Sequence, residues 1–157
     1  RPISDCVNKF MPKDFYQVSL KIILKNKQGG VLLLKAVDNG SYAGYYDLPG
    51  GRINADEFRT TLPKIIEREI IEEIGKIKYK LNEKSAALGR HLIPGKYLRD
   101  KKDIHCFYVF FEAGYIKGEI KVSPEHTGYK WVDLEKIKLA DYFKSGILEG
   151  LKMYMGR

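Results

Sequence analysis

The sequence predicts a single α/β domain over residues 1–157, in which helices cover both faces of a mixed β-sheet. Three observations support this fold class. Stretches rich in β-branched and aromatic residues occur on both sides of one central helical pattern, and a second helical pattern closes the chain. The 157 residues are enough to bury one hydrophobic core. The sequence contains no internal repeat, low-complexity segment or long linker that would divide it.

The first part of the chain predicts a short helix and then a β-hairpin. We expect the helix over residues 3–11. Residues 15–25 are rich in β-branched and aromatic side chains, residues 27–30 contain the two glycines of a turn, and residues 31–37 continue as a second strand. A loop follows and ends in a Leu-Pro-Gly-Gly segment at Gly51.

Residues 61–74 predict an amphipathic helix. A proline near its start suits the first turn, and Gly75 suits its C-terminal cap. Apolar side chains recur every four residues, which predicts one buried stripe. The stripe consists of Leu62, Ile66, Ile70 and Ile74.

The second part of the chain predicts further strands and a closing helix. The expected strands are residues 76–81, 86–92, 104–113 and 129–132, and the expected helix is residues 139–155. Strands on both sides of a central helix, with another helix at the end, indicate a mixed sheet covered on both faces.

The charge balance favours an anionic partner. The chain has 28 Lys and Arg against 20 Asp and Glu, a net charge of +8. Nucleotides, nucleic acids and acidic membrane surfaces all attract such a chain, so the charge does not choose among them. No apolar run approaches the roughly 20 residues of a membrane-spanning helix, so we expect no membrane segment.

The two cysteines, Cys6 and Cys106, lie far apart in the sequence. Cys106 belongs to an apolar, strand-like run, so we expect a buried free thiol rather than a disulfide. A free thiol favours a reducing, cytoplasmic setting.

Three glutamates gather on one side of the central helix, at Glu69, Glu72 and Glu73. Like charges at these spacings cost about 0.2–0.5 kcal/mol each. Acids in the last turn also oppose the helix dipole by roughly 0.3–1 kcal/mol. Arg68 offsets part of this cost by pairing with Glu72. Three glutamates alone are compatible with a solvated acidic face, whereas a bound divalent cation would convert them into a metal site.

The surrounding segment resembles the box of the Nudix hydrolase (MutT-like) family, G-x5-E-x7-R-E-U-x-E-E-x-G-U, where U is an apolar residue. Gly51 and Glu57 match its first half, and residues 68–75 match every specified position of its second half. The preceding Leu-Pro-Gly sequence resembles the usual lead-in of the family. The box therefore covers residues 51–76.

The chain departs from the box at two positions. Ten residues, rather than seven, separate Glu57 from Arg68, and Lys76 occupies the final apolar position. We place the three extra residues in the loop before the helix, so that the helical glutamates keep their relative geometry. A longer loop delivers Glu57, Asp56 or neither to the site.

The resemblance implies the Nudix fold, an α/β/α sandwich with a mixed β-sheet flanked by helices. It also implies a pyrophosphohydrolase that uses Mg²⁺ or Mn²⁺ to cleave a diphosphate bond between a nucleoside diphosphate and another moiety. A homodimer is compatible with this family. One alternative is an inactive Nudix-fold nucleotide-binding or regulatory module, against which the intact glutamates argue. The other is an RNA 5′-end pyrophosphohydrolase, which the basic charge slightly favours.

The resemblance assigns the metal to oxygen ligands on the helix, the glycine loop and a later loop: Glu69, Glu72, Glu73, Gly51 and Glu125. Glu125 lies six residues before Trp131, like a late metal-binding glutamate in some members. The general base is either Glu125 or Glu69. Arg68 is expected to orient the glutamates.

Substrate contacts are expected near the glycine loop, from Gly50, Gly51, Arg52, Tyr45 and Glu57. Arg52 directly follows the glycine pair and is placed to meet a phosphate. Tyr45 is a candidate for stacking on a base, as are Tyr42 and Tyr46. Further candidates for an anionic substrate are Lys96 and Arg99, whereas His126 is expected at the surface.

Overall fold

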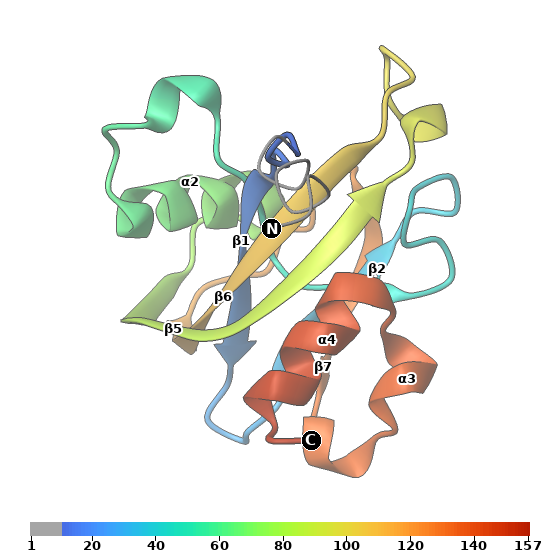
Figure 1. The fold of residues 1–157 in the computed structure, drawn as a ribbon. Coiled ribbons are helices and arrows are strands. Elements are labelled where there is room, and N and C mark those ends of the chain that lie inside the picture. Colours follow the sequence, from blue (N-terminus) through green and yellow to red (C-terminus); the bar gives the residue numbers. More distant parts are fainter. Residues whose placement is uncertain (1–10) are drawn as a thin grey trace, which may run out of the picture.

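The computed structural model describes residues 11–157 and contains one strongly curved sheet with helices on both faces (Figure 1). Its strands are β1 (Gln17–Lys25), β2 (Val31–Ala36), β3 (Tyr46–Asp47), β4 (Gly50–Arg52), β5 (Lys78–Ile93), β6 (Ile104–Lys117) and β7 (His126–Val132). Its α-helices are α2 (Leu62–Ile74), α3 (Leu139–Tyr142) and α4 (Ser145–Tyr154). Short 3-10 helices occupy Ala55–Glu57, Gly95–Tyr97 and Leu134–Lys136. The helix expected over residues 3–11 lies almost entirely outside the described residues, as does Cys6.

Strand β1 lies at the centre of the sheet because its apolar side chains are buried on both faces. It runs parallel to β6 along its whole length and antiparallel to β2 at its end, where Lys25 faces Val31. Its N-terminal half pairs instead with β4, where Leu20 faces Gly51. The sheet is therefore mixed, as expected, and the glycine segment is held as a strand at its centre.

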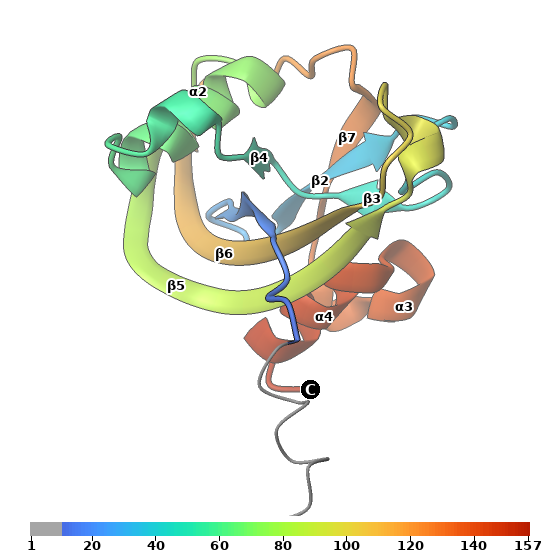
Figure 2. The ribbon, with the colours of Figure 1, turned by 45° about the horizontal axis from the view of Figure 1, so that its top comes forward.

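The two faces of the sheet carry separate apolar clusters. Helix α2 lies on one side of the sheet, and α3 and α4 lie on the other (Figure 2). Ile22 and Leu24 of β1 pack with the buried side chains of α2. Ile23, between them, points to the other face and packs with the cluster that includes α3 and α4. Alternate residues of one strand thus bury against opposite layers. This arrangement confirms the predicted α/β/α sandwich.

The second half of the chain differs from the sequence-based expectation in two places. The strands expected at residues 76–81 and 86–92 are one long strand, β5, with irregular pairing between Leu81 and Ser85. These irregularities allow β5 to follow the curvature of the sheet without a turn. The closing helix is divided into α3 and α4, because Phe143 is extended and buried between them.

The buried face of α2 also differs from the predicted stripe. Ile66, Ile70 and Ile74 are buried as expected, but Leu62 is 42% exposed and Ile65 is buried in its place. Leu62 is the first residue of the helix, and the buried contacts with the sheet begin one turn later. None of the described helices is long and apolar enough to span a membrane.

These positions allow a matched test of the interface between α2 and the sheet. We expect Ile66→Ala to lower the free energy of unfolding by about 2–5 kcal/mol, because it leaves a cavity in a closed layer. Leu62→Ala, on the same helix, should change it by only about 0.5 kcal/mol, because that side chain is largely solvated. Urea unfolding followed by circular dichroism measures both values. Equal losses in the two variants would contradict the burial pattern.

Candidate active site

A cavity of about 560 Å³ opens beside α2, where the helix faces the glycine strand β4 and the loop before β7. Most residues that the sequence predicted for the site line this cavity. They are Gly50, Gly51, Arg52, Arg68, Glu69, Glu72, Glu73 and Glu125. The fold therefore brings together residues that are more than 70 positions apart in the sequence.

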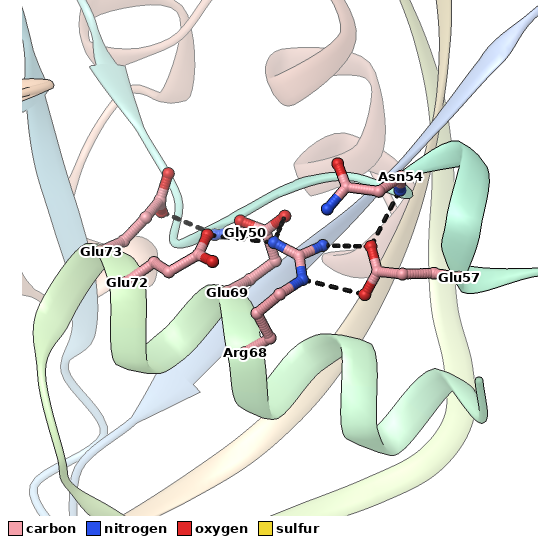
Figure 3. A network of polar contacts seen from close by, with 7 residues as sticks. All are labelled: Gly50, Asn54, Glu57, Arg68, Glu69, Glu72 and Glu73. Atoms are coloured by element: carbon pink, nitrogen blue, oxygen red, sulfur yellow. Dashed lines mark hydrogen bonds and ion pairs between the residues drawn. The ribbon is translucent and has the colours of Figure 1, made fainter.

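Arg68 links the glutamates of α2 to the loop before the helix (Figure 3). Its Nε and Nη2 donate to the two carboxylate oxygens of Glu57, at 2.9 and 2.6 Å. Its Nη1 donates to Glu69 at 2.8 Å and to Glu72 at 3.0 Å. Two parallel hydrogen bonds between a guanidinium and a carboxylate fix both groups in one orientation. Arg68 thus orients Glu69 and Glu72, while Glu57 orients Arg68.

The lengthened loop delivers Glu57, and not Asp56, to this network. Residues 55–57 form a 3-10 helix, and the backbone N–H of Asn54 donates to Glu57 Oε1 at 2.9 Å. The three extra residues are accommodated between this turn and α2. Glu57 lies behind Arg68 rather than in the cavity wall, so its contact with the site runs through Arg68.

The glycine pair allows β4 to approach α2 closely. Gly50 has φ +132°, and a Cβ at that position would overlap the backbone of Leu20. A Cβ on Gly51 would overlap the carboxylate of Glu69. The backbone N–H of Gly50 donates to Glu73 Oε2 at 2.8 Å. The two glycines therefore leave the space that the glutamates of the helix occupy.

Glu69 and Glu73 are buried carboxylates, only 6% and 7% exposed. Burial raises the pKa of Glu73 to about 8, although nearby Lys21 opposes this shift. Burial also raises the pKa of Glu69, against the effect of Arg68. Glu72 faces solvent more openly. The two inner glutamates thus lie where a negative charge is costly unless a cation compensates it.

A buried ion pair that sequence reasoning missed forms the floor of the cavity. Lys21 is 5% exposed, and its Nζ lies 3.0 and 3.1 Å from the two carboxylate oxygens of Asp47. Burial lowers the pKa of Lys21, but Asp47 and Glu73 outweigh this and raise it overall. A lysine within the apolar run of β1 was the available signal, since buried lysines are rarely unpaired.

The far end of the cavity is lined by Tyr42, not by Tyr45. A tight turn, in which Tyr45 N–H donates to the Tyr42 carbonyl at 2.9 Å, separates the two side chains. Tyr42 is buried and lines the cavity, whereas Lys144 covers the ring of Tyr45 outside it. Tyr46 packs against the core and the ring of Tyr142.

The loop before β7 is fixed to the C-terminus of α2. The backbone N–H groups of Lys121 and Ser123 donate to the carbonyls of Ile74 and Glu73, both at 2.9 Å. This docking brings Glu125 and His126 to the cavity. His126 was expected at the surface, but its Nδ1 is buried, and burial lowers its pKa.

Cys106 is buried and free, as predicted, and lines the cavity. Burial raises the pKa of its thiol, which keeps it in the less reactive protonated form. Lys96 and Arg99 are exposed in the connection between β5 and β6 and do not line the cavity.

The cavity carries an excess of acidic side chains in a basic protein. Asp47, Glu69, Glu72, Glu73 and Glu125 line it, against three bases, Lys21, Arg52 and Arg68. Within residues 11–157, no three acidic, histidine or cysteine side chains already converge as a formed metal centre. Arg68 and the N–H of Gly50 instead hold the inner oxygens of the glutamates.

Comparison with protein families matches the NUDIX domain over residues 15–151. The chain therefore belongs to the NUDIX family and is a hydrolase of pyrophosphate bonds. It is 28% identical, over 134 residues and 80% of each chain, to the RNA pyrophosphohydrolase of Wolbachia sp. subsp. Brugia malayi. Among solved structures it resembles the MutT protein of Methanosarcina mazei Go1, with 30% identity, a TM-score of 0.58 and coverage of 80% of this chain and 83% of that one.

The ORF135 protein of E. coli has the same fold, with a TM-score of 0.65 and coverage of 93% of this chain and 94% of that one. Its sequence identity is 19%.

The buried position of Glu73 predicts a pH-dependent stability. Its pKa rises from 4.5 in the unfolded chain to about 8 in the folded protein, so the folded state binds the proton more tightly. This stabilisation is complete below pH 4.5 and is lost as the pH rises to 8. Between about pH 7 and 8, where the unfolded chain's histidines are mostly neutral, we expect the free energy of unfolding to fall.

Urea unfolding at several pH values, with a chelator present, measures this slope. Glu73→Gln should remove most of it, because glutamine carries no titrating proton. Glu67→Gln, on the exposed side of the same helix, should leave the slope unchanged. A wild-type protein that gains stability over this range would show that Glu73 is ionised in the folded state.

Proposed function

We propose that the chain is a divalent-metal-dependent pyrophosphohydrolase that cleaves a diphosphate bond between a nucleoside diphosphate and another moiety. The charge of the cavity carries this proposal: five carboxylates line it against three bases, although the whole chain has a charge of +8. A diphosphate anion is repelled by such a cavity unless cations neutralise the carboxylates. The positive remainder of the surface attracts the anion to the protein.

The donor groups of the cavity fit Mg²⁺ or Mn²⁺, which prefer oxygen ligands. We assign the metal to Glu69, Glu72 and Glu73, together with the carbonyl of Gly51 and the carboxylate of Glu125. A cation binds the ionised form of the buried glutamates and so removes the cost of their burial. When bound, the metal neutralises phosphate oxygens and promotes ionisation of a water molecule.

The remaining groups of the site orient the glutamates or bind the substrate. Arg68 holds Glu69 and Glu72 in place and is itself held by Glu57. Arg52 is placed at the cavity edge, where Gln17 accepts a hydrogen bond from its Nη1 at 2.8 Å, and we assign it to a phosphate of the substrate.

We assign the general base to Glu125. Glu69, the other candidate, is engaged by Arg68 at 2.8 Å. The carboxylate of Glu125 lies at the cavity and forms no hydrogen bond or ion pair with any other residue of the described chain. A base needs a free oxygen for the attacking water, and a Glu125 that binds the metal through one carboxylate oxygen would keep the other oxygen for this role.

A panel of nucleoside diphosphate derivatives with Mg²⁺, analysed for released nucleotides, tests the proposed activity. We expect wild-type cleavage of at least one member and none in excess chelator. Glu73→Gln and Glu69→Gln should each lower kcat by about a hundredfold or more, because a lost metal ligand removes several kcal/mol of charge stabilisation.

Glu67→Gln provides the matched control, since Glu67 lies on the exposed face of the same helix. This variant should keep wild-type activity. Cleavage that persists in chelator, or in Glu73→Gln at the wild-type rate, would rule out the metal mechanism. If the wild type cleaves no member of the panel, the substrate class is wrong.

A second candidate substrate is the 5′ end of an RNA. Two observations favour it: the 28% identical relative named RNA pyrophosphohydrolase, and a basic tip on the connection between β5 and β6. The tip consists of the exposed side chains of Lys96, Arg99, Lys101 and Lys102. The tip begins shortly after Ile93, which lines the cavity. The nucleotides that follow a bound 5′ end would therefore lie close to the basic side chains of the tip.

Replacement of the four basic residues of the tip by alanine tests this candidate. We expect the variant to bind a 5′-triphosphorylated RNA oligomer more weakly. The slope of log K against log salt concentration, where K is the binding constant, should become shallower by about 0.7 for each phosphate that the tip no longer neutralises. Hydrolysis of mononucleotide substrates should not change. The control variant replaces Lys78, Lys80, Lys84 and Lys117, which lie on the same two strands away from the cavity. Equal weakening by both variants would indicate only nonspecific attraction.

A further inference from the structure

The buried ion pair of Lys21 and Asp47 lies on the floor of the cavity, beside the glutamates of α2. The side chains of the two residues are only 7% and 15% exposed. Replacing a buried ion pair by apolar side chains is often neutral or stabilising, because it is costly to take two charges out of water. The stability of the fold is therefore a weak reason for this pair, and its position suggests a role in the site.

Lys21 has a second carboxylate close by, that of Glu73. Lys21 on β1 faces Gly50 on β4 directly, and a Cβ on Gly50 would lie 3.0 Å from the Cα of Lys21. The backbone N–H of the same glycine donates to Glu73 Oε2 at 2.8 Å. No side chain of Gly50 therefore separates the lysine from the glutamate. Burial raises the pKa of Glu73, and attraction to the ammonium of Lys21 opposes this rise, so the two charges interact.

Asp47 holds the ammonium of Lys21 through both of its carboxylate oxygens, at 3.0 and 3.1 Å. Its own orientation is fixed by the backbone, because its Oδ1 also accepts the N–H of Leu48 at 2.7 Å. Among residues 11–157, by contrast, the carboxylate of Glu73 accepts a hydrogen bond only from Gly50 and forms no ion pair with Lys21. The lysine is therefore paired with Asp47, and Glu73 keeps an oxygen without a partner.

We propose that Asp47 is a positioning residue of the metal site, which holds the ammonium of Lys21 away from Glu73 and so leaves that glutamate free to bind a divalent cation. This inference rests on the proposed function, in which Glu73 is a metal ligand. A lysine released from Asp47 would carry an uncompensated charge in the buried floor, and pairing with Glu73 would relieve that cost. An ammonium on Glu73 would then compete with the metal for the same carboxylate.

Asp47→Asn tests this role, because asparagine keeps an oxygen for the N–H of Leu48 but has no charge to hold Lys21. Titration with Mn²⁺, followed by the electron paramagnetic resonance of the free ion, measures metal affinity without turnover. We expect Asp47→Asn to weaken Mn²⁺ binding by about tenfold or more. Adding Lys21→Met to this variant should restore the affinity to within about threefold of the wild type, because the competing ammonium is gone.

A double-mutant cycle with Glu73 separates positioning from the simple loss of a negative charge near the metal. If Asp47 acts through Glu73, Asp47→Asn should weaken Mn²⁺ binding by less than about threefold in the Glu73→Gln background. An equal effect in both backgrounds would mean that Asp47 attracts the metal directly, and it would overturn the inference. Glu119→Gln is the matched control, since it removes one acid from the exposed pair of Glu119 and Lys121. This variant should keep the wild-type affinity.

The outcomes separate this inference from the proposed function. If the wild type does not bind Mn²⁺, or Glu73→Gln binds it equally well, the metal assignment of Glu73 fails and this inference fails with it. If Glu73→Gln weakens Mn²⁺ binding but Asp47→Asn does not, only the positioning role is wrong. If Asp47→Asn does not fold, a crystal structure of the metal-free wild type decides. Contact of Lys21 Nζ with Asp47 alone supports the inference, and contact with Glu73 contradicts it.

Discussion

The site depends on one constraint: two glutamates occupy the side of α2 that packs against the sheet. Glu69 and Glu73 lie where apolar side chains are expected, in the narrow space between the helix and the glycine strand. Carboxylates in such a position need hydrogen bonds or opposite charges, or they become protonated. Arg68 donates a hydrogen bond to Glu69, and the backbone N–H of Gly50 donates one to Glu73. These contacts offset only part of the cost of burying the charges, because the pKa of Glu73 is still raised. The divalent cation that we propose would supply the remainder, so the unfavourable burial and the proposed chemistry would have the same origin.

The C-terminus of α2 shows how the fold accommodates acids in an unfavourable place. The last turn of this helix contains no basic residue, although it carries Glu72 and Glu73. Two of its free carbonyls accept hydrogen bonds from the backbone of the loop before β7. These hydrogen bonds satisfy backbone carbonyls at the helix end, to which a basic side chain could otherwise donate. The same contacts hold Glu125 at the cavity, so the capping of the helix and the position of the fourth carboxylate are one structural feature.

The sequence predicted the elements whose signals are local. The spacing of apolar residues located α2, the content of β-branched and aromatic residues located β1, and the box located the glutamates and glycines. It did not predict features that depend on distant contacts. Leu62 matched the helical period but lies before the first turn that meets the sheet. Asp47 and Lys21 are 26 positions apart, and only the pairing of β1 with β4 and its neighbours brings them together. The choice between Tyr42 and Tyr45 depended on a turn whose direction no periodic pattern encodes.

The uneven distribution of charge affects how an anion reaches the site. The cavity lining has two more acids than bases, so the surface outside it carries more positive charge than the whole chain does. A free anion is therefore attracted to the protein at long range and repelled at the cavity. An anion that arrives with its own divalent cation experiences the attraction without the full repulsion, because the cation offsets the negative charge of the carboxylates. The division of charge between surface and cavity thus favours a metal-bound diphosphate over the same anion without metal, before any residue of the site touches it.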